Sequence, residues 1–392
     1  MEVMIETCCG IDVHQKTIVC CILDGPLSTN SPRKFEKTFG TRTRELRQAM
    51  QWLDEHHVTH IFMESTGQYW IPVFNIFSEG NFISVLANPQ HIKNVPGRKT
   101  DVKDAEWIAQ LGRCGLIDAS YIPSEKVLEL RYMTRRRQSY MQKRTQTKNE
   151  IHNILQRSNI KLTSYLSDIF SVSGQALLEL FIHGEVLTLE KVQACLHGRV
   201  KASPEDILLA MDGKMSRTDR LLLSNSLEEY RFYTRKIEEL TQEIGHYILQ
   251  HFPKEYRLLM EIPGIKENGA AIILGEIGPN VDAFPTAGHL ASWAGVAPGS
   301  YESAGKRKSS HITQGNKYVK TALFNSGGTA GRSKDPAFNS LYHRIAAKGS
   351  KMKAVVACGH KLLRIIYKVL SEGVHYDIKK ALGLRQQALV QN

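Results

Sequence analysis

The sequence predicts an α/β domain at the N-terminus, a helical and partly coiled-coil middle region, and a mainly helical C-terminal domain. Two observations lead to this fold class. Short β-branched and cysteine-rich runs alternate with segments of helical spacing up to about residue 120, and helical spacing dominates afterwards. The length of 392 residues corresponds to two or three domains at roughly 100–200 residues each. We expect the domains to span 1–120, 121–254 and 255–392.

The N-terminal domain is expected to alternate strands with helices. Residues 7–24 place β-branched residues and cysteines on either side of the polar turn His14-Gln15-Lys16, which predicts two strands. Apolar residues three and four apart indicate helices, and short apolar runs indicate buried strands. The further elements expected here are a helix over 42–56, a strand over 60–64, a helix over 70–77, a strand over 82–87 and a helix over 101–111 with Thr100 as its N-cap.

The middle region is helical and contains a heptad pattern. Residues 121–158 are helical and basic, whereas 159–218 have a helical tendency and no recognisable chemistry. Between Leu223 and Tyr247, apolar and aromatic residues recur at the a and d positions of a heptad. This seam fits an antiparallel hairpin with 125–157 as well as an intermolecular coil, and the second arrangement would produce oligomers.

The C-terminal domain begins with a tight turn and contains one long polar loop. Pro263-Gly264 lies before a Gly/Ala-rich helix, an order similar to a helix–hairpin–helix, whose turn exposes N–H groups to a phosphate. A plain turn between packed helices explains the pattern equally well. Residues 298–317 are rich in Gly, Ser and Lys, which predicts a loop, and helices are expected over 317–330 and 335–370.

Cysteine usage and hydropathy indicate a cytoplasmic protein. The chain has seven cysteines, an odd number, and they form no C-x-x-C motif. Four of them lie in apolar runs. This usage argues against a disulfide framework and a zinc site. The first residues lack the basic and apolar regions of a signal peptide. No uninterrupted apolar run reaches the roughly 18 residues of a membrane span, so we expect no contact with a membrane.

The positive charge is concentrated in the last quarter of the chain. The formal net charge is +12, but residues 301–392 hold 17 Lys or Arg against 4 Asp or Glu. The first 300 residues have a net charge of −1, and within them 121–160 is +6. Concentrated charge of this kind favours a polyanionic partner, nucleic acid above all, over simple solubility.

Four carboxylates have the spacing of a metal site. Asp12 lies within the apolar first strand, where an acid is costly unless it is paired or holds a metal. Glu64 ends the central strand, and Asp101 and Asp104 are three residues apart at a helix start. This order resembles the ribonuclease H-like metal site, and clustered carboxylates suit Mg²⁺. The helix dipole alone would also favour the last two acids at that position.

The position of Asp12 is also typical of a different class of protein with the same fold. Actin-like sugar kinases also place an Asp after Gly-Ile in the first strand. They need a small glycine turn next, to admit a phosphate, whereas the bulkier Val13-His14-Gln15 follows here. The sequence therefore disfavours a sugar kinase.

The loop at 300–311 combines serines with three consecutive cations. Ser303 precedes Lys306, Arg307 and Lys308, which could hold a phosphodiester and stabilise its developing charge. A serine hydroxyl is a weak nucleophile until it is activated. From the residues alone, a phosphate-binding loop without a covalent step explains the pattern better.

Several motifs together resemble the DEDD transposases of the 110 family of bacterial insertion sequences. They are GIDVHQKT, FMESTGQYW, NPQHIKNVPGRKTDVKDAEWIAQLGRCGLI, IPGIKENGAAIILGEIG and FPTAGHLASWAGVAPGSYESAGKRKSSHITQGNKYVKTAL. The resemblance covers roughly 7–120 and 255–345 and leaves the middle unexplained. It implies an N-terminal ribonuclease H fold like that of Holliday-junction resolvases, with Mg²⁺, or Mn²⁺ as a substitute, on Asp12, Glu64, Asp101 and Asp104.

The resemblance also implies a covalent serine and a guide RNA. The family serine lies in a Ser-x-Gly loop after a Gly-x-x-Pro turn, here Ser303-Ala304-Gly305 after Gly295-Val296-Ala297-Pro298. Ala304 departs from the usual pattern, so Ser300, Ser309, Ser310 and Ser326 remain rivals. A structured noncoding RNA would pair with donor and target DNA in a homo-oligomeric (dimer or tetramer), nucleoid-associated bacterial enzyme. The residues suited to backbone contacts are Arg135, Arg136, Arg137, Lys143, Arg144, Lys306, Arg307 and Lys308.

Two other functions remain open at this point. A metal-dependent junction nuclease would use water in place of the serine, and it would form no covalent intermediate. A nucleic-acid-binding protein could keep the fold without catalysis, although all four acids are present. No phosphate-binding G-x-x-x-x-G-K-[ST] motif occurs, which agrees with a transesterification that needs no ATP.

Overall fold

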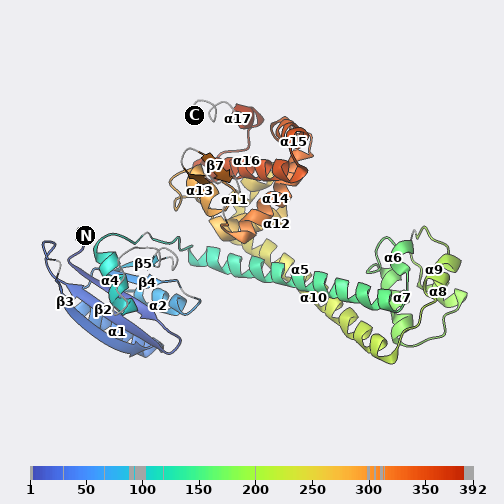
Figure 1. Ribbon diagram of the computed structural model, residues 1–392, viewed down its shortest axis with the longest axis horizontal. Coiled ribbons are helices and arrows are strands. Elements are labelled where there is room, and N and C mark those ends of the chain that lie inside the picture. Colours follow the sequence, from blue (N-terminus) through green and yellow to red (C-terminus); the bar gives the residue numbers. More distant parts are fainter. Residues whose placement is uncertain are drawn as a thin grey trace. The chain divides into compact units, whose positions relative to one another are not determined.

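The computed structural model separates the chain into two compact units, Met1–Ile122 and Pro123–Asn392 (Figure 1). Each unit has its own core and is considered by itself. Among the described residues, no helix is both long enough and apolar enough to cross a membrane. The structure describes residues 3–29, 31–65, 67–87, 92, 103–117, 119–198, 200–297, 301–303, 306–309, 312 and 314–383.

The first unit is built on a five-stranded mixed sheet with the order β3-β2-β1-β4-β5. The first three strands of the chain run antiparallel, as hairpins with short connections do, and the last two run parallel to β1. The α/β character predicted for this region is confirmed. The strands are β1 (Thr7–Val13), β2 (Thr17–Asp24), β3 (Arg33–Gly40), β4 (His60–Glu64) and β5 (Ile83–Ala87).

Helices cover both faces of this sheet. Because successive side chains of a strand point to opposite faces, Cys9 and Ile11 of β1 join the core beneath α1 (Thr43–Glu55) and α2 (Trp70–Phe77). Cys8 lies on the other face, in the smaller core that α4 (Asp104–Arg113) covers. Both faces of the central strand are therefore buried, which explains its continuous apolar sequence.

Two details of the first unit differ from the expectation. The strand β3 was not predicted, because its sequence RKFEKTFG is charged and mostly exposed at the edge of the sheet. The helix α4 begins at Asp104 after Lys103, whose side chain forms no capping bond. Thr100 is therefore not its N-cap, and Thr100 itself lies outside the described residues.

The second unit is organised by two long antiparallel helices, α5 (Glu125–Arg157) and α10 (Arg217–His251). The heptad residues Leu223, Ile237 and Ile244 are buried in this hairpin, and Tyr247 donates a hydrogen bond to a carboxylate oxygen of Glu129. Of the two arrangements that the heptad allowed, the structure has the intramolecular hairpin. The apolar residues of the heptad are buried within one chain, so the heptad gives no support to an oligomer.

A small helical cluster joins the distal ends of α5 and α10 (Figure 1). Its apolar residues, among them Leu177, Leu178 and Met211, pack with Ile151 and Leu223 of the two long helices. The segment that showed no chemistry in the sequence therefore forms a separate core at this end of the hairpin. Its helices are α6 (Leu162–Tyr165), α7 (Val172–Ile182), α8 (Leu189–Cys195) and α9 (Pro204–Ala210).

The C-terminal helices pack around α12, α14 and α16 near the start of α5 (Figure 1). Gly264 takes a φ of 83° in the turn before α12, and a Cβ there would lie 2.2 Å from the carbonyl oxygen of Ser326. The turn is thus pressed against α14. The elements are α11 (Pro253–Met260), α12 (Glu267–Ile277), α13 (Ala287–Trp293), β6 (Tyr301–Ser303), β7 (Lys306–Ser309), α14 (Lys317–Gly331), α15 (Pro336–Lys348), α16 (Lys351–Glu372) and α17 (Ile378–Gly383).

Candidate functional site

Asp12 and Glu64 lie side by side at the carboxyl ends of two parallel strands. The parallel ladder between β1 and β4 pairs Ile11 with Met63, so the next residue of each strand is an acid. Alternation places Asp12 on the face of Cys8, and Glu64 on the face of Phe62, which is the face that α4 covers. The register of the sheet therefore brings both carboxylates to one point.

Asp104 joins them because α4 crosses the sheet unusually close to β1. A Cβ added to Gly10 would lie 2.1 Å from the carbonyl oxygen of Ala105 and 2.4 Å from the backbone nitrogen of Ala109. Only glycine permits this approach. Asp104 is the first residue of the same helix, directly before Ala105. The contact therefore sets the helix start over the end of β1 that carries Asp12.

The electrostatics of Asp12 confirm that the three acids are neighbours. Burial raises the pKa of the Asp12 carboxyl, and repulsion from Asp104 and Glu64 raises it further. His14 works in the opposite direction, with its Nε2 3.2 Å from Oδ2 of Asp12. The Asp12 side chain keeps 27% of its surface exposed, so the cluster remains open to solvent and to a ligand.

The donor set of this cluster fits a hard divalent cation. Its three members offer only carboxylate oxygens, which are the ligands that Mg²⁺ and Mn²⁺ prefer. Within the part of the chain that the structure describes, no three His, Cys, Asp or Glu side chains form a group already arranged to hold an ion. Asp101, the fourth predicted acid, lies outside the described residues.

Ser303 lies on a short β-hairpin where the sequence predicted only a loop. It is the last residue of β6 and pairs with Lys306, the first residue of β7. Glu302 pairs with Arg307, and the register shifts between Tyr301 and Glu302. The backbone therefore holds the serine and the cationic run on adjacent strands, with Ser303 at the end nearest the turn.

The base of this hairpin is closed by backbone contacts. The amide of Asn316 donates a hydrogen bond to the carbonyl of Trp293, 3.1 Å away. Gly315 has a φ of 84°, and a Cβ there would lie 2.3 Å from the amide nitrogen of Gly295. The two ends of the segment that carries the serine hairpin therefore meet at one point of the helical core.

A buried carboxylate holds that base to the long helix α5. The side chain of Glu276 is fully buried and accepts two hydrogen bonds from Arg135, at 2.7 and 2.8 Å. The side-chain amide of Asn316 donates a third, at 2.8 Å. Arg131 donates to the backbone carbonyls of Gly275 and Glu276. The network therefore joins α5, α12 and the start of α14, where the serine hairpin ends.

Sequence reasoning missed Glu276 and Asn316. The available signal for Glu276 was a single acid within the apolar run AAIILGEIG, since a buried charge requires a partner. Asn316 caps α14 by accepting bonds from Tyr318 and Val319, in addition to its bond to Glu276. Both residues connect sequence segments that are far apart, so their pairing could not be read from spacing.

The basic residues proposed for nucleic acid fall into three structural groups. Arg135 is engaged with Glu276 and stacks on Tyr318. Arg136 stacks on Tyr140, and Lys143 lies near the ring of Tyr233. Among the described residues, Arg137 has neutral partners alone, and burial and the charge of Arg144 lower its pKa. Of Lys306, Arg307 and Lys308 the structure gives the backbone position alone, on β7.

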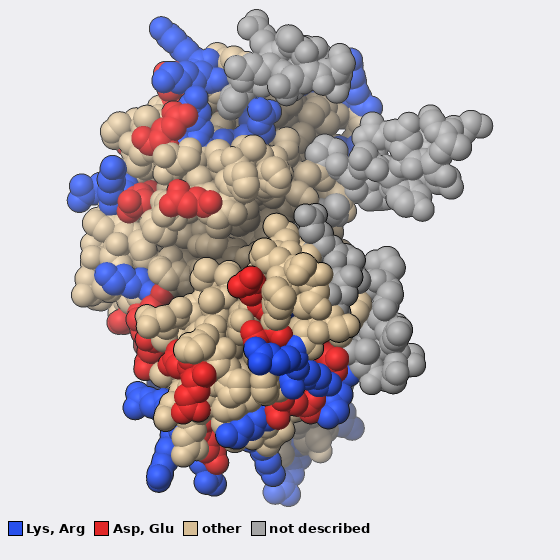
Figure 2. Space-filling model, turned by 90° about the vertical axis from the view of Figure 1, so that its left-hand side faces the viewer, with Lys and Arg blue, Asp and Glu red and all other residues tan. Residues whose placement is uncertain are grey.

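The surface charges on one face of the molecule are mixed. Figure 2 shows Lys and Arg side chains interspersed with Asp and Glu over its described atoms. In the first unit, Lys34 contacts Glu106, Lys103 contacts Glu36, and Arg33 contacts Asp24. These pairs agree with the nearly neutral charge of the first 300 residues.

The rival serines differ in position. Ser326 is buried within α14, and Ser309 ends β7. Ser300 and Ser310 lie outside the described residues.

Comparison with known proteins finds matching family models in the N-terminal and C-terminal parts of the chain. Residues 9–160 match the DEDD transposase model of the IS110 group, described as a transposase, and residues 256–343 match the transposase IS116/IS110/IS902 family. An uncharacterised protein of insertion element IS110 from Streptomyces coelicolor is 31% identical over 133 residues, 33% of this chain and 32% of that protein.

Two other relatives match nearly the whole chain. The pilin gene-inverting proteins of Moraxella bovis and Moraxella lacunata are 24% and 25% identical over 387 and 389 residues. In both cases the match covers 95% of this chain and 98% of the relative.

The two matched regions identify a transposase, an enzyme that cuts and rejoins DNA. The two family models lie in the expected order and together cover more than half of the chain. The chain belongs to the IS110 family of insertion-sequence transposases.

Proposed function

We propose that this transposase recombines DNA by serine transesterification supported by a divalent metal, and that an RNA made by its element guides it. The convergence of Asp12, Glu64 and Asp104 at one end of the sheet carries the proposal. The cluster lies at the carboxyl ends of two parallel strands, and α/β proteins commonly bind their ligands at that edge of the sheet.

We assign the first unit to the ribonuclease H-like fold. Its support is the strand order β3-β2-β1-β4-β5 with an antiparallel β1-β2-β3 hairpin pair and parallel β1, β4 and β5. The acids at the ends of β1 and β4 and on α4 agree with this assignment. We propose that the regions 1–120, 121–254 and 255–392 are the functional domains of the protein.

Mg²⁺, or Mn²⁺ in its place, would be held by Asp12, Glu64, Asp104 and the undescribed Asp101. The bound cation would stabilise negative charge on the attacked phosphate. The protein positions the carboxylates. The register of β1 and β4 positions Asp12 and Glu64, and the close contact at Gly10 positions Asp104.

Ser303 is the proposed nucleophile. Its Oγ forms a bond to the scissile phosphorus and gives up its proton, while the bond from phosphorus to the 3′ oxygen breaks and that oxygen takes up a proton. The product is a phosphoserine link and a free 3′ hydroxyl. Attack by the 3′ hydroxyl of another strand reverses the step and releases Ser303, so the bond energy is conserved.

The substrates are donor and target DNA, and base pairing with a structured noncoding RNA supplies the sequence specificity. This assignment leaves the protein to contact backbones, for which the cations of α5, β7 and the last quarter of the chain are suited. Recombination of two duplexes requires several subunits, so we propose a homo-oligomer acting on the bacterial chromosome.

The experiment traps the covalent intermediate. Purified protein, its RNA, Mg²⁺ and nicked DNA are incubated and analysed under denaturing conditions for a protein–DNA adduct. The adduct is expected with the unaltered protein, and with Ser309→Ala as the matched control on the same hairpin. Ser303→Ala and Asp12→Asn should abolish it.

Adduct formation by Ser303→Ala would reject this serine. Cleavage without any adduct would instead support a metal-dependent junction nuclease that uses water. Salt-sensitive binding with no turnover in either Mg²⁺ or Mn²⁺ would show a nucleic-acid-binding protein without catalysis.

A further inference from the structure

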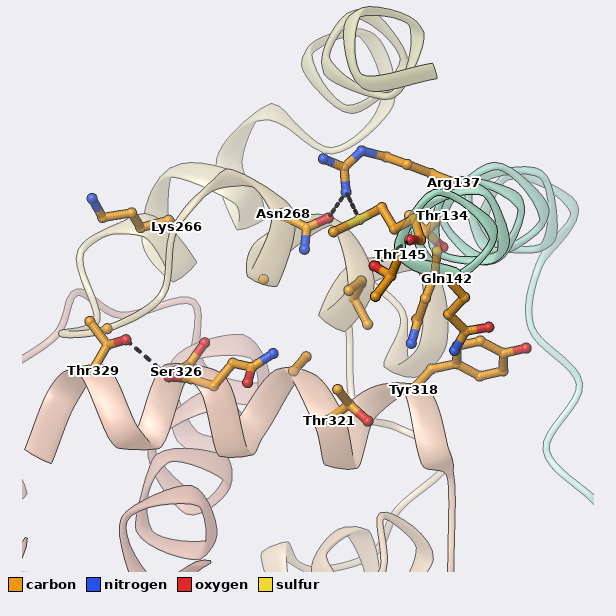
Figure 3. Close-up of a pocket in the computed structure, with 17 residues that line it drawn as sticks. Thr134, Arg137, Gln142, Thr145, Lys266, Asn268, Tyr318, Thr321, Ser326 and Thr329 are labelled. Atoms are coloured by element: carbon orange, nitrogen blue, oxygen red, sulfur yellow. Dashed lines mark hydrogen bonds between the residues drawn. The ribbon is translucent and has the colours of Figure 1, made fainter. Parts of the chain in front are cut away.

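A groove of about 750 Å³ lies between α5, the start of α12 and α14 in the second unit (Figure 3). Its size is within the roughly 300–1,000 Å³ of pockets that bury a drug-sized ligand. None of its lining residues belongs to the serine hairpin or to the first unit. The function proposed above therefore leaves it without a role.

Polar side chains line both long walls of the groove, beside the apolar Met141, Ile272 and Ala322, whereas helix faces that meet are normally apolar. On α14, Thr321, Asn325 and Thr329 follow one another at intervals of four residues, which places them on one face. On α5, Thr134, Gln138, Gln142 and Thr145 form a second stripe. Figure 3 shows labelled members of both stripes on either side of the space between the helices.

Among the described residues, two cations and no carboxylate line this groove. Arg137 stands on α5 and Lys266 just before α12. The other polar lining groups are hydroxyls and amides, which can donate hydrogen bonds to phosphate and sugar oxygens. A groove for a cation or for a basic peptide would instead require acidic side chains.

Arg137 is a half-buried cation with neutral partners. Its guanidinium donates to Oδ1 of Asn268 and Oγ1 of Thr241, each at 2.6 Å (Figure 3 shows the first bond). Among the ion pairs of the described residues none includes Arg137, whereas Arg135, two residues earlier, is neutralised by Glu276. Burial lowers the pKa of Arg137, and the charge of Arg144 lowers it further, so its surroundings favour an added anion.

Gln138 provides a polar atom that has no partner in the described part of the chain. Its Oε1 is buried and accepts no hydrogen bond among the described residues. A buried amide oxygen of this kind is costly unless a ligand or water donates to it. Tyr318 also lines the groove, and the cations of Arg135 and Lys317 lie over its ring, 4.5 and 5.2 Å from the centroid.

We propose that this groove binds an unpaired segment of nucleic acid, with a phosphate at Arg137 and sugar or base groups along the two polar stripes. The volume admits one or two nucleotides of a single strand and excludes a duplex. The inference rests on the proposed function, because it takes the nucleic acid of the transposase as the occupant. Displaced DNA and unpaired RNA share this backbone chemistry, so both are tested.

The experiment measures binding of fluorescein-labelled short oligodeoxythymidylate and oligouridylate by anisotropy, with the full-length protein in EDTA. Arg137→Gln is expected to weaken the preferred strand about tenfold, the loss of one charge-assisted contact. The slope of log affinity against log salt should fall by about 0.7, the value for one phosphate contact of a single strand. The probe that loses more affinity identifies the source as DNA or RNA.

Thr321→Trp fills the groove without changing its charge. Thr321 is exposed on α14, so the substitution leaves the helical core intact, and it should weaken the same probe. Arg235→Gln is the matched control, because it removes an exposed arginine of α10 that pairs with Glu239, lies over the ring of Phe232 and is outside the groove. It should bind within about twofold of the unaltered protein.

Unchanged binding in both Arg137→Gln and Thr321→Trp would overturn the proposal, and so would an equal loss for a duplex probe. Asp12→Asn should bind the single strand normally, since the assay contains no metal and measures no cleavage. The groove and the recombination mechanism can therefore fail independently.

Discussion

Arg135 and Glu276 form a bidentate ion pair across α5 and α12, and the carboxylate in it is completely buried. The two residues are 141 positions apart in the sequence. Asn316 adds a third bond to the same carboxylate. The pair therefore fixes the long helix, the helical core and the end of the serine-bearing segment to one another.

Replacement of Glu276 should destabilise the second unit. Glu276→Ala leaves the half-buried Arg135 and Arg131 without their carboxylate, and we expect the free energy of unfolding to fall by about 3 kcal/mol. Glu276→Gln keeps an acceptor and should lose roughly half as much. Urea denaturation followed by circular dichroism measures both. Glu239→Ala, which removes an exposed partner of Lys236, is the control and should change stability by less than about 0.5 kcal/mol.

The position of α4 should depend on Gly10. In Gly10→Ala the new methyl group meets Ala105 and Ala109, so α4 must shift and carry Asp104 away from Asp12. We expect a loss of roughly 2 kcal/mol in the stability of the first unit and a loss of DNA cleavage. Gly245→Ala is the control, because nothing lies within 4 Å of a Cβ there. Full cleavage activity in Gly10→Ala would show that the helix position does not matter.

The closed base of the serine hairpin should be needed for the covalent step. Gly315→Ala places a side chain at a φ of 84° and against Gly295. We expect adduct formation to fall at least about tenfold, which corresponds to about 1.4 kcal/mol, while thermal stability of the first unit is unchanged. An adduct yield equal to that of the unaltered protein would contradict this role.

Mg²⁺ should bind the first unit and stabilise it. A ligand that binds only the folded state raises its unfolding temperature, so titration of Mg²⁺ should shift the transition of the first unit. Asp12→Asn should abolish the shift. Asp24→Asn, which removes an acid paired with Arg33 instead, should retain it. A shift of equal size in Asp12→Asn would place the metal elsewhere.

Much of the first unit could be predicted from the sequence because its signals are local. Alternating apolar runs identified β1, β2, β4 and β5, and helical spacing identified α1, α2 and α4. Exposed β3 was missed because an edge strand rich in charge has no apolar pattern. The hairpin of β6 and β7 was missed because Gly, Ser and Lys resemble a loop when the pairing partner is unknown.

The sequence by itself determined the family, the alternation of elements, the candidate acids and the concentration of charge in the last quarter, since each depends on residue type and short spacing. Only the tertiary structure decided that Asp12, Glu64 and Asp104 are neighbours and that the heptad folds back on α5. It also decided that Arg135 is paired with Glu276, whereas Arg137 has no acidic partner among the described residues. These properties depend on strand register, close helix approach and contacts between distant segments. Such contacts are set by packing of the whole chain, and residue type and local spacing do not contain them.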